Sequence, residues 1–220
     1  MAIVLSTTLL QSAGFPHAFS TRDATFEQIA RALGVGPEHV RRVKQVHSAR
    51  VIVAGNEPTE STEADALVSR AEEAVAVQTA DCVPILVGDR VTGAVAAIHA
   101  GWRGVVSGIV PNAIEMLARN REDLVAAIGP CIGACCFEVG EDVAEKIAAS
   151  SGAAVVARRA GAKAFVDLRL ATRIQLTRAG IANARIEDVV RCTYCETDLF
   201  FSYRRDGANA GRLVSAIAPR

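Results

Sequence analysis

The sequence predicts an α/β fold of layered, mixed β-sheets flanked by helices, formed by a single domain that spans residues 1–220. Two apolar runs, Val83 to Val87 and Ala94 to Ile98, have the length and continuity of strands that are covered on both faces. Segments with helical spacing of apolar residues follow these strands. A chain of 220 residues of which 50% are hydrophobic is long enough for one sizeable core.

The first half of the chain predicts a short N-terminal strand, one helix and several further strands. Thr25 to Leu33 carries apolar residues three and four positions apart, which indicates an amphipathic helix that ends at Gly34. Short apolar segments bounded by polar turns then predict strands at Arg41 to His47, Arg50 to Ala54, Ala64 to Ser69 and Ala74 to Thr79. The turn residues between Gly88 and Gly93 predict a hairpin that joins the two buried runs.

The second half of the chain alternates between strands and helices. Helical spacing predicts helices over Val105 to Asn120, Glu141 to Ala149 and Leu168 to Ala179, the last ended by Gly180. Apolar runs predict strands at Leu124 to Ile128, Ile186 to Val190 and Leu213 to Ile217. The Ala-rich, Gly-containing segment Ala148 to Ala164 is interpreted as a surface excursion, and the polar, aromatic-bearing loop Cys192 to Arg212 is long enough to be functional.

The charge and hydropathy of the sequence argue against nucleic acid and membranes as binding partners. The 24 basic residues balance the 24 acidic ones without long runs of either sign, so no electrostatic footprint for nucleic acid or an anionic membrane is present. The apolar stretches are too short for a membrane helix, and the N-terminus lacks the basic region of a secretory signal. These features predict a cytoplasmic protein that acts on a small molecule, and they leave its oligomeric state open.

Three polar side chains interrupt the apolar strands and form the first candidate site. His47 and His99 each come at the end of a predicted strand, and Cys82 precedes another. Two imidazoles and one thiolate can hold a zinc ion and leave a position open for water or substrate, which is typical of catalytic zinc. Copper also binds such ligands, so the metal is not fixed by ligand type.

The same residue types are compatible with other classes of protein. Cys82 as nucleophile, His99 as base and Asp81 or His47 as the orienting group would form a metal-free cysteine hydrolase. A binding module without catalysis is a third hypothesis. Single histidines and cysteines are more often buried structural residues than ligands.

Seven ordered motifs resemble those of a known family. They are VKQVHSARV, EADALVS, VQTADCVPIL, AAIHAGWRGVVSGIV, IGPCIGACCFEVGEDV, FVDLRLATRIQL and CTYCETDLFFSYRRDGANAGR. They are similar to the motifs of the laccase-domain purine nucleoside phosphorylases, also called the peptidoglycan editing factor family. The resemblance runs from about Arg41 to the C-terminus, and it implies a mixed α/β fold with paired sheets between helices.

The resemblance also implies an activity and a ligand set. It implies zinc held by His47, Cys82 and His99, phosphorolysis of adenosine, inosine, guanosine and methylthioadenosine, and deamination of adenosine. Other descriptions of the family imply a copper polyphenol oxidase or a hydrolase that edits a peptidoglycan precursor. Before Arg41 the chain departs from the family, because Ser20-Thr21-Arg22 runs directly into Asp23 and a family segment is missing there.

Further residues are candidates for supporting roles. Arg103 precedes a predicted helix, where anions are favoured, and is a candidate for binding phosphate in the active site. Asp81 is a candidate to orient a ligand or accept a proton. Candidates for binding substrate are Arg22, which keeps a family position, Asp65, Arg205 beside Arg204, and Cys131 in a glycine-bounded turn. The simpler alternative for each is an ordinary surface charge or a buried thiol.

The remaining cysteines allow a different metal hypothesis. Cys192 and Cys195 form a C-x-x-C pair that, together with Cys131, Cys135 and Cys136, could form a structural zinc cluster. The sequence contains no second C-x-x-C motif, so buried or reactive thiols are the simpler interpretation of these five residues.

Overall fold

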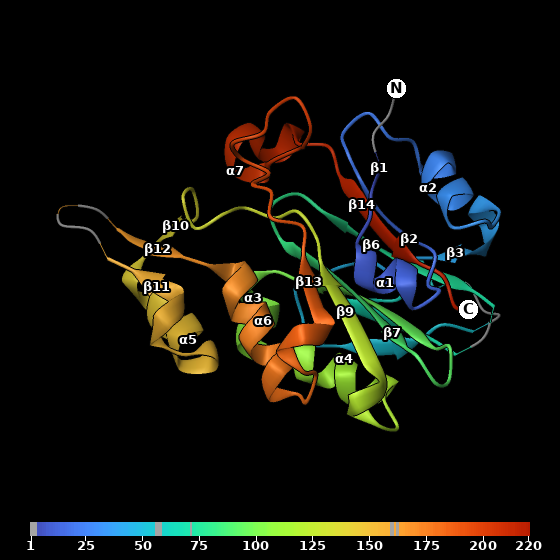
Figure 1. Cartoon of the computed structure of the whole chain (residues 1–220). Coiled ribbons are helices and arrows are strands. Elements are labelled where there is room, and N and C mark those ends of the chain that lie inside the picture. Colours follow the sequence, from blue (N-terminus) through green and yellow to red (C-terminus); the bar gives the residue numbers. More distant parts are fainter. Residues whose placement is uncertain (1–3, 56–58, 71, 159–160, 162) are drawn as a thin grey trace.

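Two large β-sheets form the centre of the computed structural model, which describes residues 4–55, 59–70, 72–158, 161 and 163–220 (Figure 1). The five-stranded sheet has the order β1 (Val4–Leu5), β2 (His17–Ser20), β14 (Leu213–Ile217), β6 (Ala74–Thr79) and β3 (Val40–Arg41). The six-stranded sheet has the order β13 (Ile186–Asp188), β9 (Leu124–Ile128), β7 (Val83–Asp89), β8 (Val95–Ala100), β5 (Ala66–Ser69) and β4 (Val51–Val53). Both sheets mix parallel and antiparallel pairs.

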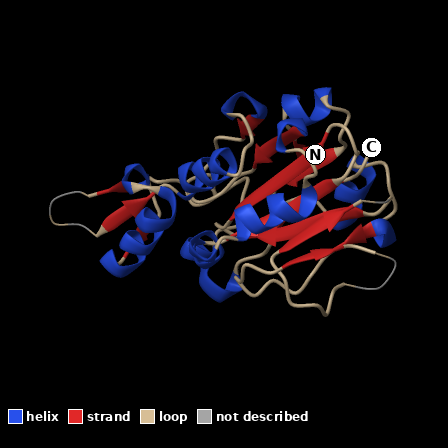
Figure 2. Cartoon of the chain, turned by 90° about the horizontal axis from the view of Figure 1, so that it is seen from below, coloured by secondary structure: helices blue, strands red, loops and turns tan. Residues whose placement is uncertain are grey.

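The two sheets pack face to face, and helices cover their outer faces (Figure 2). Successive residues of one strand point to opposite faces, and the core follows this alternation. In β6, Val75 belongs to the core between the sheets, whereas Ala76 belongs to the core under the outer helix. In β7, Leu86 lies between the sheets and Ile85 lies under the other helical layer. Burial of both faces explains the continuous apolar runs in the sequence.

Short helices complete the layers. Helix α2 (Phe26–Ala32) covers the five-stranded sheet, and α3 (Trp102–Ser107), α4 (Ile109–Leu117) and α6 (Leu168–Arg178) lie on the six-stranded sheet's side. Helix α1 (Thr8–Ser12) contacts β9 and β13. Thr25 begins α2 with a reciprocal capping box to Gln28, which fixes the helix start at the predicted position.

A third, three-stranded sheet lies to one side of these layers. It consists of β10 (Glu138–Val139), β12 (Ala164–Val166) and β11 (Val156–Ala157), and it packs with α5 (Glu141–Ser151) at the left of Figure 1. The predicted surface excursion over 148–164 therefore contains a strand and the end of a helix, and its residues 159–160 and 162 lie outside the described residues.

Most predicted elements are confirmed, including β6, β9 and β14 with the predicted bounds and the hairpin between β7 and β8. The predicted strand from Arg41 to His47 is wrong beyond β3. Its backbone instead bridges to Glu63 and donates to the Asp65 carboxylate, which replaces pairing with a strand.

The predicted helix from Val105 to Asn120 is also wrong in its bounds. It begins at Trp102, and Gly108 at φ +86° divides it into α3 and α4. A left-handed residue ends one helix and lets the next leave in another direction. Strand β2 and helix α1 were not predicted. In the described part of the chain, no helix combines the length and apolar character of a membrane span.

Candidate active site

His47, Cys82 and His99 meet where β7 begins and β8 ends. Cys82 directly precedes β7, and the antiparallel register of β7 and β8 pairs Pro84 with His99. One ligand atom from each of the three side chains lies within 4.8 Å of the others. The Cys82 Sγ is 3.8 Å from the His47 Nε2, and the two imidazole rings contact edge to face. We refer to these three residues as the His–Cys–His centre.

The Asp65 carboxylate accepts hydrogen bonds that hold both histidines of the centre in position. It lies just before β5 with no exposed surface, and its Oδ1 accepts a 2.8 Å hydrogen bond from the His99 Nδ1. The same carboxylate accepts backbone N–H bonds from His47 at 2.9 Å and Ser48 at 2.6 Å. These bonds stabilise His47 at φ +61°, a conformation that is rare for a non-glycine residue. The carboxylate thus positions the centre and does not line the cavity.

Electrostatic coupling ionises the centre. Burial opposes ionisation of Asp65, but hydrogen bonds from His99 and Ser48 lower its pKa to about 2. Burial likewise opposes the Cys82 thiolate, yet the neighbouring His99 and His47 lower the Cys82 pKa to about 6. Burial also disfavours a charged His99, but Cys82 and Asp65 raise its pKa to about 9. In the metal-free centre these pKa shifts favour a Cys82 thiolate beside a protonated His99, which releases its second proton when it binds a metal.

The donor set and its surroundings fit a metal ion. The thiolate is the form of cysteine that binds metals, and a carboxylate on one imidazole nitrogen is the usual support for a ligating histidine. Gly101 keeps the space free, because a Cβ there would lie 2.8 Å from the His47 Cδ2 and 3.0 Å from the Cys82 Sγ. Two nitrogens and one sulfur leave a coordination position for another ligand.

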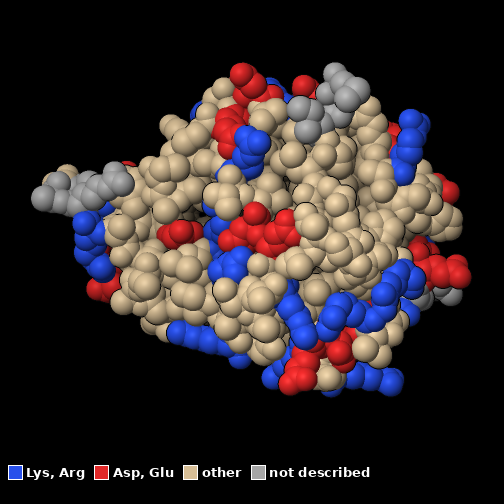
Figure 3. Space-filling view, viewed as in Figure 1, with Lys and Arg blue, Asp and Glu red and all other residues tan. Residues whose placement is uncertain are grey.

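The centre opens into a cavity of about 670 Å³. Its walls combine charged and aromatic side chains, among them Lys44, Trp102, Arg103, Phe137, Tyr203, Arg204 and Arg212. Three of these side chains are arginines: Arg103, Arg204 and Arg212. None of them takes part in an ion pair among the described residues. On the face seen in Figure 3, basic and acidic side chains are interspersed and no broad patch of one sign forms. The three arginines are exposed residues at the cavity, and their unneutralised guanidinium charge favours an anionic ligand there.

Asp81 lies on the cavity wall, but its carboxylate is engaged elsewhere. Its Oδ1 accepts from the Thr193 hydroxyl at 2.6 Å, and its Oδ2 accepts from the Ser202 hydroxyl and the Arg204 backbone N–H. With φ +82°, Asp81 turns its side chain toward the C-terminal loop while the next residue, Cys82, joins the centre. Asp81 thereby attaches the loop that carries Tyr203 and Arg204 to the centre.

The arginines predicted to bind substrate occupy two different positions. Arg103 lines the cavity with its guanidinium 4.6 Å from the centroid of the Trp102 ring. Arg22 and Arg205 are not among the cavity-lining residues. Arg22 donates to the Thr197 carbonyl, and Arg205 donates to the carbonyls of Thr193, Tyr194 and Phe200, so both brace the loop between β13 and β14.

Cys131 is separated from the other loop cysteines. It is fully buried, which raises the pKa of its thiol to about 12, and its sulfur accepts a 3.6 Å contact from Arg169. Cys135, Cys136, Cys192 and Cys195 instead bring their sulfur atoms within 4.8 Å of one another. The structure thus assembles four of the five cysteines that the sequence offers for a structural zinc cluster.

Several residues of the cavity were not predicted from the sequence. Gln45 and Gln78 exchange two 2.7 Å hydrogen bonds and line the cavity, as do Phe137, Tyr203 and Arg212. The last two lie in the FFSYRRDGANAGR segment, whose clustered aromatic and basic residues were an available signal. No local pattern links Gln45 to Gln78, which lie 33 positions apart.

The fold and the centre together define a class of α/β proteins in which paired sheets present two histidines and a cysteine to one cavity. Residues 21–220 match the family model described as multi-copper polyphenol oxidoreductase laccase, and the chain belongs to this family of enzymes.

Curated relatives carry nucleoside-related names. The chain is 41% identical over 210 residues to "Purine nucleoside phosphorylase YfiH" of Escherichia coli, covering 91% of this chain and 83% of the relative. It is 40% identical over 205 residues to "Adenosine deaminase RL5" of an unknown prokaryotic organism, covering 86% and 78%.

Solved structures share the fold. Bacillus licheniformis hypothetical protein YfiH superposes with a TM-score of 0.86 at 26% identity, covering 94% of this chain and 93% of that one. YlmD from Geobacillus stearothermophilus gives the same TM-score and identity, covering 97% and 94%. The mixed α/β fold predicted from the sequence is confirmed.

Proposed function

We propose that the protein is a zinc-dependent purine nucleoside phosphorylase that cleaves adenosine, inosine, guanosine and methylthioadenosine and also deaminates adenosine. The observation that carries this proposal is a His–Cys–His centre in a cavity whose arginines have no carboxylate partner among the described ion pairs. The names of the relatives supply the class of substrate. A nucleoside and inorganic phosphate are the corresponding small-molecule partners.

The proposed phosphate site is formed by guanidinium groups. Arg103, Arg204 and Arg212 line the cavity, and Arg204 is held by its bond to the Glu138 carbonyl and by the Phe137 ring. Guanidinium groups bind phosphate through two parallel hydrogen bonds and keep their charge at all relevant pH values. They would hold phosphate for attack on the ribose C1′ while the bond from C1′ to the base nitrogen breaks.

The proposed base site is formed by aromatic and polar residues. Phe137, Tyr203 and Trp102 offer faces on which a purine can stack. Thr79 is one of the cavity-lining residues, and its hydroxyl oxygen is buried without a hydrogen-bond partner among the described residues. A buried hydroxyl without a partner is costly, and a ring nitrogen or exocyclic group of the base would satisfy it.

Zinc is the metal that we propose for the centre, with His47, Cys82 and His99 as ligands. When bound, the ion would act as a Lewis acid that polarises a substrate group or activates water. Asp65 contributes by fixing the His99 tautomer and the His47 backbone. Copper binds the same donor types, so phenol oxidation coupled to dioxygen by a copper-loaded sample would contradict the zinc proposal.

The remaining predicted residues act around this site. We propose that Asp81 acts by positioning the C-terminal loop beside Cys82 and not by accepting a proton, because both of its carboxylate oxygens already accept hydrogen bonds from that loop. Arg22 and Arg205 contribute by bracing the loop that carries Tyr203 and Arg204. Cys131 supports the same wall from inside the protein, because the Thr193 backbone N–H donates to its carbonyl.

A cysteine hydrolase is the second candidate, favoured by the contact between the Cys82 sulfur and the His47 Nε2 and by the lowered pKa of the Cys82 thiol. In that enzyme Cys82 attacks a carbonyl carbon of the substrate, such as a peptidoglycan precursor, and a histidine protonates the leaving group. An electrophilic probe would then trap Cys82 in the active enzyme, and the activity would survive removal of metal.

Incubation of zinc-loaded protein with adenosine, with and without phosphate, tests the first candidate. Separation of the products should show adenine and ribose 1-phosphate only with phosphate, and inosine in both samples. Release of adenine at the same rate without phosphate would contradict phosphorolysis. Absence of both reactions, with a metal-independent hydrolase activity in the same preparation, would favour the second candidate.

A further inference from the structure

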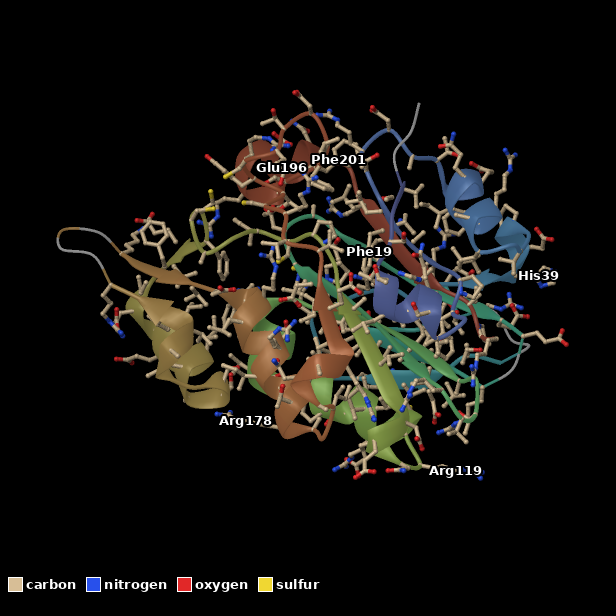
Figure 4. The ribbon with its side chains drawn as sticks, in the orientation of Figure 1. Phe19, His39, Arg119, Arg178, Glu196 and Phe201 are labelled. Atoms are coloured by element: carbon tan, nitrogen blue, oxygen red, sulfur yellow. The ribbon has the colours of Figure 1, made fainter. Side chains whose placement is uncertain are left out.

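A second sulfur-rich site lies outside the cavity, where two loops of the chain meet. Cys135 and Cys136 lie in the loop between β9 and β10, and Cys192 and Cys195 lie in the loop between β13 and α7 (Tyr203–Asp206). We refer to these four residues as the thiol cluster. Figure 4 shows sulfur atoms gathered beside Glu196, whose carboxylate accepts a 3.1 Å hydrogen bond from the Cys192 backbone N–H.

The spacing of the sulfur atoms matches a tetrahedral metal site. The Cys135 sulfur lies 3.5 Å from that of Cys136, 3.7 Å from that of Cys192 and 3.8 Å from that of Cys195. The Cys136 and Cys195 sulfurs are 3.3 Å apart, and all four cysteines are free. Four sulfurs at about 2.3 Å from a zinc ion are separated by about 3.8 Å. A disulfide requires about 2.05 Å.

The backbone around the cluster stabilises the thiolate form of its cysteines. The Gly133 N–H donates a 3.2 Å hydrogen bond to the Cys192 Sγ, a contact that stabilises a thiolate. A Cβ on Gly133 would lie 3.1 Å from the Cys135 Sγ and 3.3 Å from the Cys192 Sγ, so glycine is what lets this backbone approach the sulfurs. Crowded thiolates repel one another unless a cation lies between them.

We propose that the thiol cluster binds one structural zinc ion, at a site separate from the His–Cys–His centre. Four thiolates in tetrahedral arrangement are typical of zinc that has no open position, and such a site supplies folding energy without catalysing a reaction. The ion joins two loops that are far apart in the sequence. This proposal does not depend on the nucleoside activity.

The position of the cluster defines its effect on the cavity. Its first loop carries Ile132 and Phe137, which line the cavity, and its second loop continues into Tyr203 and Arg204 on the same cavity. The Asp81 carbonyl accepts the backbone N–H of Ile132, and its carboxylate accepts the Thr193 hydroxyl, so both loops also meet next to the centre. Zinc in the cluster therefore fixes the wall that faces the substrate.

Metal counting on the full-length chain tests the proposal. Protein purified under reducing conditions is stripped with a chelator and titrated with Zn²⁺ alone, and bound zinc is measured by mass spectrometry of the element. We expect two zinc ions per chain. Cys82→Ser should lose the ion of the centre and keep the other, whereas Cys195→Ser should lose the ion of the cluster and keep that of the centre.

Cys131→Ser is the matched control, because Cys131 lies in the first loop but outside the thiol cluster. It should retain both ions. Titration with Co²⁺ provides a readout that does not depend on activity: the cobalt–thiolate charge-transfer absorption should persist in Cys82→Ser and be strongly reduced in Cys195→Ser.

Two results on the wild-type protein would overturn the proposal without requiring any variant to fold. One is a single bound zinc together with all four cluster thiols reacting freely in the zinc-loaded protein. The other is an intact mass showing that the reduced preparation converts these cysteines to disulfides while zinc is present. Failure of the nucleoside assay would leave the zinc count unaffected, so the two proposals fail separately.

Discussion

The Asp65 carboxylate accepts a hydrogen bond of 2.8 Å from the His99 Nδ1, and both side chains are almost fully excluded from solvent. This pair links the six-stranded sheet to the cavity, since Asp65 precedes β5 and His99 lies on the neighbouring strand β8. The same carboxylate holds the His47 backbone, so one residue positions two of the three groups of the centre.

Asp65→Asn should weaken metal binding by about 10- to 100-fold, the usual cost of removing a carboxylate behind a ligating histidine. The asparagine side chain would retain the shape of the carboxylate but lose the charge that holds the His99 ring. Competition with a chromogenic chelator measures the change. Glu63→Gln is the matched control, because that carboxylate is exposed and pairs with Lys44. Equal affinities of Asp65→Asn and wild type would contradict the positioning role.

Cys82 should react with an alkylating agent at a lower pH than an ordinary thiol. Its pKa of about 6 lies below the usual 9.0, so the thiolate fraction rises as pH increases through about 6. In metal-free protein at neutral pH we expect alkylation to be on the order of tenfold faster than for an unperturbed thiol. Mass spectrometry of the Cys82 peptide across pH gives the profile.

Two variants control this pH profile. His99→Ala removes the main positive neighbour and should move the rise in Cys82 reactivity toward higher pH. Cys131, which is buried with a pKa of about 12, should stay unmodified throughout. A Cys82 profile that rises only near pH 9 would show that the histidines do not stabilise the thiolate.

Arg103→Met should raise the KM for phosphate by roughly 10- to 100-fold, the magnitude expected for losing a hydrogen bond to a charged group. Adenosine deamination requires no phosphate, so its rate should change little. Arg119→Met is the matched control, because Arg119 is exposed, is not among the cavity-lining residues and lies at the opposite side of the molecule from Glu196 (Figure 4). An equal loss of both activities in Arg103→Met would show that Arg103 maintains the shape of the cavity and does not bind phosphate.

Gly101→Ala should reduce metal affinity by at least about tenfold while the protein still folds, because the added Cβ would press on His47 and Cys82. The backbone at Gly101 has φ −71°, which alanine adopts without strain. Metal content and thermal unfolding of the variant measure the two effects separately.

Gly108→Ala should show the opposite pattern. Gly108 has φ +86°, and an added Cβ would have only Pro111 within 4 Å, so the cost is about 1–2 kcal/mol of conformational strain. Metal affinity should be unchanged. Loss of metal in Gly108→Ala, or its retention in Gly101→Ala, would contradict the assigned packing of the centre.

Local patterns in the sequence were sufficient for much of the fold. The apolar runs of β7 and β9 and the capped helix α2 are encoded by neighbouring residues, so their positions could be predicted. Strand β2 could not, because its four residues include the polar His17 and Ser20, so they form no apolar run. Both polar side chains are buried with hydrogen bonds to Thr7 and to the Val214 backbone, which only the tertiary structure supplies.

The sequence by itself determined the chemical identity of the centre: two histidines and a cysteine that interrupt apolar strands. Only the tertiary structure decided their support and surroundings. It placed the Asp65 carboxylate behind His99, turned Asp81 toward the C-terminal loop and assembled the thiol cluster from two loops. These relationships depend on the direction of each side chain and on contacts between segments that are remote in sequence. Only the pairing of strands and the packing of layers establish that direction and those contacts.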